Sequence, residues 1–364
     1  MRLENNKILK RFCFIDLISS TAPFNFFFIK TLSKSAIVDV YCSETNYNDL
    51  FVKGLERLPN VKLRKFFISS TIRKGRFGAT FEVFRLYCIL IKNSVRYDEI
   101  YLNFPQILAL DFLLITLLRS KVNWLVHNVD RQLNSIEAFS NSCRFVLFKK
   151  LIFLSECGYI QYKRTLRHNE KPSKILSIAT HGMLPLNLEK KSKSANWNLD
   201  IKNIRLISIG NVKPYKGLIE LLTLASELRT KKIKCYIYGK FDKQYLKSDF
   251  ERTGWLVDNN FQDDNKLIDI VISKSIFILP HLYSTQSGLF YTFLNYRALF
   301  IASRCGQQEL SFKKFGLEEL LFEPGNVKEV ISSLNFVINN KFEVIQKFEA
   351  LRRSIKWEKI KVLA

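Results

Sequence analysis

Two glycines and two lysines share one short segment of the chain. The run "ISIGNVKPYKG" (Ile207–Gly217) begins with β-branched residues, stops at Gly210, and carries Lys213 and Lys216 before its second glycine. Glycine allows the backbone to approach a ligand closely, and lysine adds a point charge. The amphipathic pattern "LIELLTLASEL" follows directly, so we predict a helix that starts at Gly217. The N–H groups and positive dipole end of that helix would bind an anion.

The same loop is also compatible with an ordinary surface turn that carries two solvated lysines. It lacks the P-loop spacing G-x-x-x-x-G-K-[ST], and the chain contains no G-x-G-x-x-G. A dinucleotide-dependent enzyme therefore has no support from the sequence.

A second loop has the same character. In "SIFILPHLYSTQSGLFYTF" a strand is followed by the loop His281–Ser287, and Gly288 opens a predicted helix. Ser287 and Gly288 would present backbone N–H groups with little side-chain bulk, which suits phosphate oxygens. Two anion sites at adjacent strand ends of one sheet fit a diphosphate.

Short β-branched runs alternate with helical patterns along the chain, which is typical of parallel sheets crossed by helices. In the first half we predict strands in 11–19, 36–42, 61–69, 97–104 and 122–129, and helices in 24–34, 79–93 and 105–119. In the second half we predict strands in 204–210, 233–239, 275–280 and 299–303, and helices in 218–229 and 265–274 and from 288. The polar stretch Leu184–Asn203 indicates a linker. A length of 364 residues exceeds what one core usually serves, so the predicted fold class is α/β, with two doubly wound, Rossmann-like domains facing each other across a cleft.

The chain is strongly basic, with 57 basic and 33 acidic side chains and a net charge of +24. Such a charge indicates a polyanionic partner: nucleic acid, an anionic lipid surface or a phosphorylated substrate. The basic residues are densest between Val61 and Phe77, with phenylalanines between them. We predict that this segment faces a membrane, although a solvated basic face remains an alternative. Its six basic residues are Lys62, Arg64, Lys65, Arg73, Lys74 and Arg76.

Targeting signals and cysteine chemistry are not indicated. The N-terminus is charged and lacks an apolar stretch behind it, so we expect no signal peptide. The longest apolar run, Tyr101–Leu118, is broken by Pro105 and Asp111, so we expect no membrane-spanning helix. The seven cysteines form no C-x-x-C pair, which favours a reducing compartment over zinc or disulfide chemistry.

Taken in order, these motifs resemble those of GT-B glycosyltransferases of the bacterial surface-polysaccharide type (glycosyl transferases group 1, family 4-like). The resemblance is carried by "ISIGNVKPYKGLIELL", "IYGKFD", "SIFILPHLYSTQSGLF", "IASRCGQQEL" and "LFEPGNVKEVISSL" in the second half, and by "WLVHNVD" and "ILSIATHGM" in the first. "RRSIKWEKIKVL" is similar to the family's terminal helix. The resemblance implies an acceptor-binding domain (1–185), a linker (186–203), a nucleotide-sugar domain (204–345) and a C-terminal helix that crosses back to the first domain (346–364).

The resemblance implies a site for the donor diphosphate in the second domain. The donor-binding residues it implies are Gly210, Asn211, Lys213, Lys216, Thr285, Gln286, Ser287, Gly288 and Leu289. The chain departs from the family pattern at three points: Asn211 replaces the usual arginine, and Thr285 and Phe293 replace two glutamates. Lys216 would then neutralise more of the negative charge on the leaving diphosphate.

His127 ends the "WLVH" strand. From spacing alone a packed core histidine is the favoured interpretation, whereas the resemblance implies a hydrogen bond to the donor sugar, so His127 and Lys216 are the predicted catalytic residues. Asn128, Asp130 and Arg131 are predicted to bind the acceptor, with a solvated loop as the alternative. Sugar transfer through an oxocarbenium-like state requires electrostatic stabilisation of the leaving group. No D-x-D pair follows an early strand, so we expect no metal and no cofactor.

The sequence therefore predicts a metal-independent glycosyltransferase that moves a sugar from a nucleotide-diphosphate sugar to a glycan acceptor. The expected acceptor is a lipid-diphosphate-linked oligosaccharide. It would act in the synthesis of O-antigen (lipopolysaccharide), capsule or exopolysaccharide, on the inner face of the cytoplasmic membrane. One alternative is a nucleotide-sugar epimerase of the same fold, which needs acid–base carboxylates that we do not identify. Another is a basic nucleic-acid-binding protein, although the basic residues do not line one helix.

Overall fold

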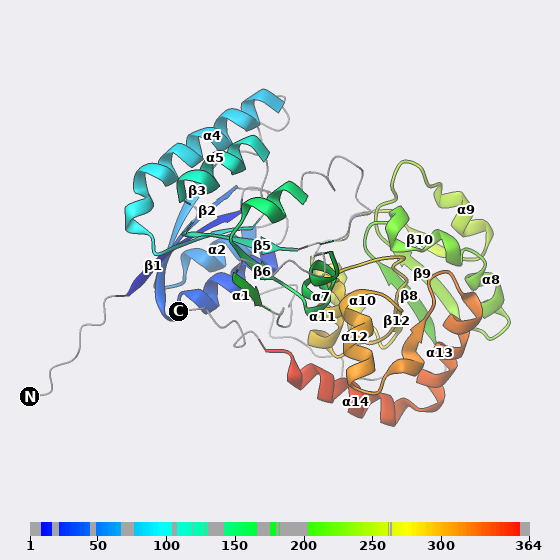
Figure 1. The fold of residues 1–364 in the computed structure, drawn as a ribbon. Helices are drawn as coiled ribbons and strands as arrows, with labels where there is room; N and C mark the ends of the chain where they lie inside the picture. Colours follow the sequence, from blue (N-terminus) through cyan, green and yellow to red (C-terminus); the bar gives the residue numbers. More distant parts are fainter. Residues whose placement is uncertain are drawn as a thin grey trace, which may run out of the picture. The chain divides into compact units, whose positions relative to one another are not determined.

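The computed structural model describes residues 9–16, 22–43, 49–66, 76–103, 108–118, 120–127, 129, 142–165, 175–179, 182, 203–260, 262 and 264–356. The chain divides into two compact units, with the boundary between His181 and Gly182 and the second unit extending to Lys356. Each unit is built on one sheet (Figure 1).

The sheet of the first unit has seven parallel strands among the described residues, in the order β3-β2-β1-β4-β5-β6-β7. The strands are β1 (Lys10–Asp16), β2 (Ala36–Ser43), β3 (Val61–Phe66), β4 (Glu99–Leu102), β5 (Val122–Val126), β6 (Lys150–Phe153) and β7 (Ile175–Ile178). Every residue of β5 is buried, as expected for a strand inside a parallel sheet with both faces covered.

Helices cover both faces of this sheet. They include α1 (Ala22–Leu32), α2 (Asp49–Glu56), α4 (Arg76–Asn93), η1 (Ser94–Arg96), α5 (Leu108–Leu118) and α7 (Glu156–Thr165), and residues 142–147 are also helical. Successive side chains of β1 lie on opposite faces of the sheet. Phe14 packs on Phe28 of α1, whereas Cys13 and Ile15 belong to a core cluster with residues of α4 and α5. The first unit is therefore doubly wound.

The second unit repeats this architecture on six parallel strands of the described chain, in the order β10-β9-β8-β11-β12-β13. The strands are β8 (Arg205–Ile209), β9 (Lys234–Tyr238), β10 (Leu256–Asp258), β11 (Ile276–Leu279), β12 (Leu299–Ser303) and β13 (Leu321–Phe322). The helices are η2 (Pro214–Lys216), η3 (Ile219–Leu221), α8 (Leu224–Arg229), α9 (Lys247–Arg252), α10 (Asp264–Val271), α11 (Gly288–Tyr296), α12 (Gly306–Lys314), η4 (Glu318–Leu320), α13 (Val327–Asn339) and α14 (Lys341–Ser354).

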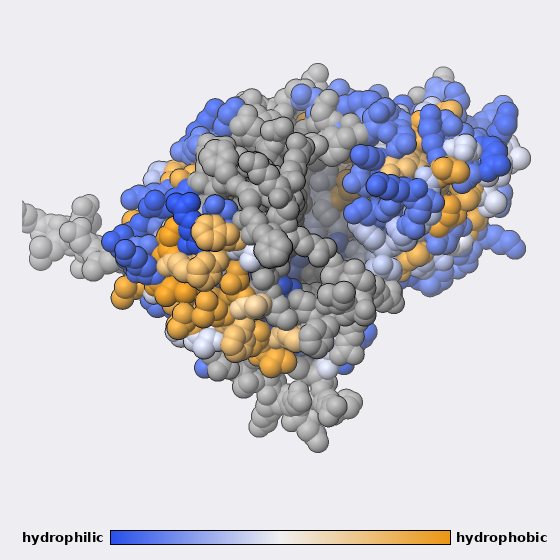
Figure 2. Space-filling view, turned by 90° about the horizontal axis from the view of Figure 1, so that it is seen from above, coloured by the Kyte–Doolittle hydropathy of each residue, from blue (hydrophilic) through white to orange (hydrophobic). Residues whose placement is uncertain are grey.

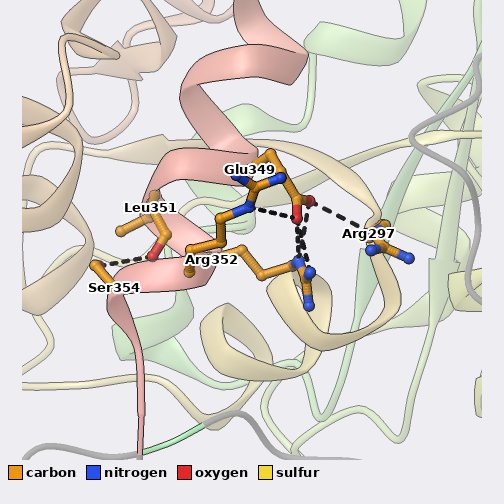
Figure 3. Close-up of polar contacts among 6 residues, drawn as sticks. Arg297, Glu349, Leu351, Arg352 and Ser354 are labelled. Atoms are coloured by element: carbon orange, nitrogen blue, oxygen red, sulfur yellow. Dashed lines mark hydrogen bonds and ion pairs between the residues drawn. The ribbon is translucent and has the colours of Figure 1, made fainter.

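An ion pair and core packing join helix α14 to the rest of the second unit. Glu349 accepts hydrogen bonds from Arg352 of its own helix, with Nη2 at 2.7 Å, and pairs with Arg297 at 3.4 Å (Figure 3). Arg297 follows the last residue of α11, so this ion pair joins α11 to α14. On the core side, Phe348 packs against Phe300 of β12 with ring centroids 4.9 Å apart.

The prediction of two doubly wound α/β domains is confirmed. The prediction of a helix from Gly217 is wrong, because two 3₁₀ turns, η2 and η3, precede α8 at Leu224. The predicted linker boundaries at 185 and 203 border a stretch outside the described residues, so they stay predictions. The helix predicted over 346–364 overlaps α14, which ends at Ser354, and its crossing back to the first domain is not described, because residues 357–364 lie outside the described chain.

Candidate functional site

The loops after β8 and β11 meet at the point where the strand order of the second sheet reverses. Strands β8 and β11 are parallel neighbours, while the chain continues from β8 to β9 on one side and from β11 to β12 on the other. Such a switch point, at the carboxyl ends of the strands, is where open α/β sheets bind ligands. Lys216 follows β8 and His281 follows β11, so both flank this point.

Gly217 allows the two loops to touch. Its φ is +65°, and a Cβ built there would lie 2.0 Å from the carbonyl oxygen of Pro280. A second contact runs beside it, since the Leu282 N–H donates to the Tyr215 carbonyl at 2.9 Å. The lysine loop is thus held against the loop after β11 by backbone contacts on both sides of Lys216.

Lys216 and His281 form the centre of this junction. Lys216 Nζ and His281 Nε2 are 2.7 Å apart. An ammonium group can only donate, so Nε2 accepts and the imidazole is neutral with its proton on Nδ1. Burial and then the neighbouring Lys213 lower the pKa of Lys216 to about 8. Burial and the Lys216 charge hold the pKa of His281 well below its ordinary value.

His281 is fixed by the next strand. Ser303 Oγ, at the end of β12, donates to the His281 carbonyl at 2.6 Å, and the side chain of His281 is only 2% exposed. Its Nδ1, buried, has no hydrogen-bond partner within the part of the chain that the structure describes. Leaving a buried N–H unpaired costs about 1–3 kcal/mol, so this nitrogen is a candidate contact for a ligand.

Two more buried polar atoms near this junction lack partners among the described residues: Oε1 of Gln286 and Oε1 of Gln308. Gln286 follows β11 and Gln308 lies in α12, which follows β12. The two loops touch, because the Gln307 N–H donates to the Thr285 carbonyl at 3.1 Å. Native proteins leave few such groups unsatisfied, so their concentration around one switch point indicates a place for a polar ligand.

Helix α11 begins at this junction as predicted, with Gly288 as its first residue. Ser287 is extended and its side chain makes no cap hydrogen bond, so the first N–H groups of α11 receive no side-chain cap from it. Gly288 is exposed, Leu289 is half-buried and Thr285 is buried. In contrast, Phe293 is fully buried and packs on Phe277 and Phe300, so this position belongs to the core.

The remaining predicted donor residues lie on the loop after β8. Asn211 and Lys213 are exposed, and Gly210 has a φ of +105°. Lys213 precedes the turn η2 that ends with Lys216. The structure therefore brings Lys216 to the junction with His281, and leaves Lys213 on the surface as a second charge.

In the first unit, His127 ends a buried chain of hydrogen bonds. Asp16 accepts from Asn25 Nδ2, Asn103 Nδ2 donates to Asn25 Oδ1 at 3.0 Å, and His127 Nε2 lies 2.6 Å from Asn103 Oδ1. Because an amide oxygen only accepts, Nε2 of His127 carries the proton. Burial lowers the pKa of His127 to about 3, so the ring is neutral.

This chain also lies at a switch point. Asp16 ends β1 and Asn103 follows β4, which are the parallel neighbours between which the order of the first sheet reverses. His127 follows β5, the next strand along. Its ring also contacts Phe24 of α1 edge-on, with centroids 5.6 Å apart.

The other predicted residues are placed only in part. The predicted acceptor residues Asn128, Asp130 and Arg131 lie outside the described residues. Lys62 and Arg64 are exposed on β3, an edge strand of the first sheet, where charged side chains also discourage edge-to-edge pairing. Lys65 belongs to β3 and Arg76 begins α4, but their side chains are outside the description, as are Arg73 and Lys74 altogether. Within the described chain, no group of three His, Cys, Asp or Glu side chains could hold a metal ion.

His281, Asn103 and Asp16 were not predicted as site residues. Each follows or ends a buried strand at its carboxyl end, in "FILPH", "YLN" and "FID". A polar residue at that place in a parallel strand is the signal that would have found them.

Solved structures of known proteins share this fold. No protein-family model and no curated protein matches the sequence. HepE of Anabaena, solved in complex with UDP and glucose, is 14% identical, with a TM-score of 0.67 over 95% of this chain and 94% of that one. WaaG, a glycosyltransferase involved in lipopolysaccharide biosynthesis, is 11% identical, with a TM-score of 0.61 over 98% and 96%.

A third similar structure is a putative UDP-N-acetylglucosamine 2-epimerase from Listeria monocytogenes, 10% identical, with a TM-score of 0.55 over 96% of this chain and 93% of that one. At such identities the likeness establishes the fold alone. The predicted GT-B fold is therefore confirmed, and the reaction has to be argued from the site.

Proposed function

We propose that the protein is a glycosyltransferase that binds a nucleotide-diphosphate sugar at the switch point of its second unit. The observation that carries this proposal is the Lys216 ammonium, which donates to a neutral His281. Three buried polar atoms around this contact have no partner among the residues that the structure describes: His281 Nδ1, Gln286 Oε1 and Gln308 Oε1. In this assignment Lys216 and the first N–H groups of α11 bind the diphosphate, and no metal is required. Similar structures with bound UDP support a nucleotide donor.

The finer parts of the proposal concern the sugar, the acceptor and the location. His127 would hydrogen-bond to the donor sugar through a neutral ring, and Asn128, Asp130 and Arg131 would contact a glycan acceptor. A lipid-diphosphate-linked acceptor, used in surface-polysaccharide synthesis at the inner face of the cytoplasmic membrane, fits the net charge of +24. The likeness to WaaG, whose role is in lipopolysaccharide biosynthesis, supports this assignment.

The test is the substitution Lys216→Ala, measured in two ways. Calorimetry with UDP, GDP and ADP gives the affinity for the nucleotide diphosphate, which should fall by about 1.5–3 kcal/mol for a lost charge-assisted contact. The rate of transfer at saturating donor should fall further, since negative charge grows on the leaving group in the transition state.

Lys231→Ala, which changes an exposed lysine after α8, is the matched control and should alter neither value. If Lys216→Ala transfers sugar at the parent rate, the diphosphate is not bound at this switch point. Conversion of the donor to its epimer, with no transfer to any acceptor, would instead identify an epimerase.

A further inference from the structure

Helix α5 buries its charged side chain, Asp111, and exposes three of its apolar side chains. Asp111 is fully buried, where Tyr87 donates its hydroxyl proton to Oδ1 at 2.8 Å and Arg144 Nε donates to Oδ2 at 3.1 Å. These bonds fix the rotation of α5 about its axis. The outward positions are Phe112, Leu113 and Leu117, which are 53%, 39% and 55% exposed. Ordinary surface helices show the reverse arrangement.

Helix α4 extends this apolar face. It packs beside α5, and its inward residues join the same core cluster, whereas Phe81 and Phe84 are 64% and 42% exposed. We call the five outward residues the α4–α5 surface: Phe81, Phe84, Phe112, Leu113 and Leu117. Figure 2 looks down on the side of the first unit where Figure 1 shows α4 and α5, and hydrophobic residues gather there. A contiguous exposed apolar patch of this kind marks an interaction site.

Basic residues border the α4–α5 surface. Arg85 and Lys92 on α4 and Arg96 in η1 are exposed. Two acidic residues lie near them in the sequence: Glu82 is half-buried, with its carboxylate 3.9 Å from the Arg85 guanidinium, and Asp98 is exposed. The surface itself offers few groups for hydrogen bonding, since Thr116 on α5 donates to the Phe112 carbonyl of its own helix at 2.8 Å. An occupant must therefore be apolar at its centre and anionic at its rim.

We propose that the α4–α5 surface docks on an anionic lipid bilayer, with its phenylalanines and leucines at the boundary between headgroups and acyl chains. Arg85, Lys92 and Arg96 would then contact lipid phosphates, as in interfacial helices with a basic border. A second copy of this chain is a poorer occupant, because two molecules of charge +24 repel each other. None of the described helices is long and apolar enough to cross a bilayer.

This inference rests on the membrane location in the proposed function, but it can fail separately. Vesicle flotation without any nucleotide or sugar measures it, using phosphatidylcholine vesicles with and without phosphatidylglycerol. The parent chain should bind the anionic vesicles more tightly than the neutral ones. Phe112→Ser with Leu117→Ser should weaken binding by about tenfold or more, because two exposed apolar side chains no longer enter the bilayer.

The matched control is Leu246→Ser with Phe342→Ser, which removes two side chains of the second unit that are 62% and 83% exposed. It should bind vesicles like the parent. All substituted side chains are exposed, so each variant should keep the parent's melting temperature, which circular dichroism verifies.

The orientation is tested at Cys88, an exposed thiol on α4. Anionic vesicles should slow its alkylation by a water-soluble maleimide, read from the peptide by mass spectrometry. The proposal is overturned if the Ser variant binds like the parent or if Cys88 reacts equally fast with vesicles present. It is also overturned if sedimentation velocity shows a dimer of the parent that the Ser variant abolishes, since a second copy then covers this surface.

Discussion

Burial keeps both His127 and His281 neutral, and at His281 the charge of Lys216 lowers the pKa further. His281 accepts from Lys216, so it keeps the ammonium in place while adding no charge of its own. His127 donates to the amide oxygen of Asn103, and this hydrogen bond orients its ring. An imidazole that stays neutral can orient a substrate through a hydrogen bond, but it does not supply a positive charge.

The pKa of Lys216 makes diphosphate binding depend on pH. The pKa is about 8 in the free protein, and a bound diphosphate raises it, because an opposite charge favours the ammonium form. Affinity should therefore be constant near pH 7 and fall as the pH rises through about 8, with uptake of a proton on binding at that pH. Calorimetry in buffers of different ionisation enthalpy measures both effects.

The window must begin at about pH 7, because a terminal phosphate itself titrates near pH 6. Lys216→Arg is the control, since a guanidinium stays charged throughout and should remove the pH dependence. Equal affinity of the parent at about pH 7 and about pH 9.5 would show that Lys216 does not titrate at the ligand.

For His127, the predicted outcome is a loss of transfer without a loss of nucleotide binding. His127→Ala should leave the protein folded, with a lower melting temperature because Asn103 Oδ1 loses a donor, and UDP affinity nearly unchanged, while the transfer rate falls strongly. Asn103→Ala, which removes the acceptor that orients the ring, should lower the rate by about tenfold, the worth of one hydrogen bond.

The pH dependence of the parent's transfer rate tests whether His127 acts as a neutral ring. With the pKa of His127 lowered to about 3, the rate should show no inflection near pH 6.5, the ordinary pKa of histidine. A limb there that disappears in His127→Ala would contradict a neutral His127.

At the scale of elements, the sequence predicted most of the buried strands, including the four-residue strands β4 and β11, and missed β6, β10 and β13. β1, β2, β8 and β12 are runs of buried β-branched and aromatic residues, and such runs are easily recognised. β10 is only Leu256–Asp258, too short for any periodicity. The helix predicted from Gly217 failed because 3₁₀ turns can carry the same leucine spacing as an α-helix over a few residues.

A site residue could be predicted only where its neighbours in the sequence already indicate a binding loop. Lys216 and Gly217 carry a local signal, as does the Ser287–Gly288 start of α11. His281 lies 65 residues from Lys216 in the chain, and the two meet only because β8 pairs with β11. No local pattern contains that information.

Gly217 offers a test of this junction. Gly217→Ala forces a side chain into a φ of +65° and places its Cβ 2.0 Å from the Pro280 carbonyl oxygen. The denaturant midpoint of the second unit should fall, and UDP binding should weaken because Lys216 is displaced. Gly254→Ala is a matched control with a φ of +98° but no atom nearer than 3.8 Å to the added Cβ.

Both variants carry a backbone penalty of about 1–2 kcal/mol. The excess loss in Gly217→Ala reports the contact with Pro280. If the two variants unfold at the same midpoint, the close approach of the two loops does not contribute to stability.

At the scale of the whole molecule, the net charge and the apolar surface should act over different distances. The charge of +24 attracts anionic surfaces from about one Debye length, which is ~10 Å at 0.1 M salt. The α4–α5 surface acts only on contact, and its contribution does not depend on salt. The two can therefore be separated by ionic strength.

Neutralising the basic segment between Val61 and Phe77 separates the two contributions. Changing Lys62, Arg64, Lys65, Arg73, Lys74 and Arg76 to glutamine lowers the net charge from +24 to 24 − 6 = +18. Each basic residue near an anionic surface contributes about 1 kcal/mol, so binding to anionic vesicles should fall at low salt. At about 1 M salt, where the Debye length is ~3 Å, the variant and the parent should bind equally.

A control with the same net charge distinguishes position from total charge. It changes six exposed lysines of the second unit to glutamine: Lys231, Lys234, Lys240, Lys243, Lys314 and Lys328. If both variants lose binding equally at low salt, total charge drives the attraction and the basic segment has no special place in it. If only the first variant loses binding, the segment lies at the lipid surface, and the first unit is the part of the molecule that approaches the membrane.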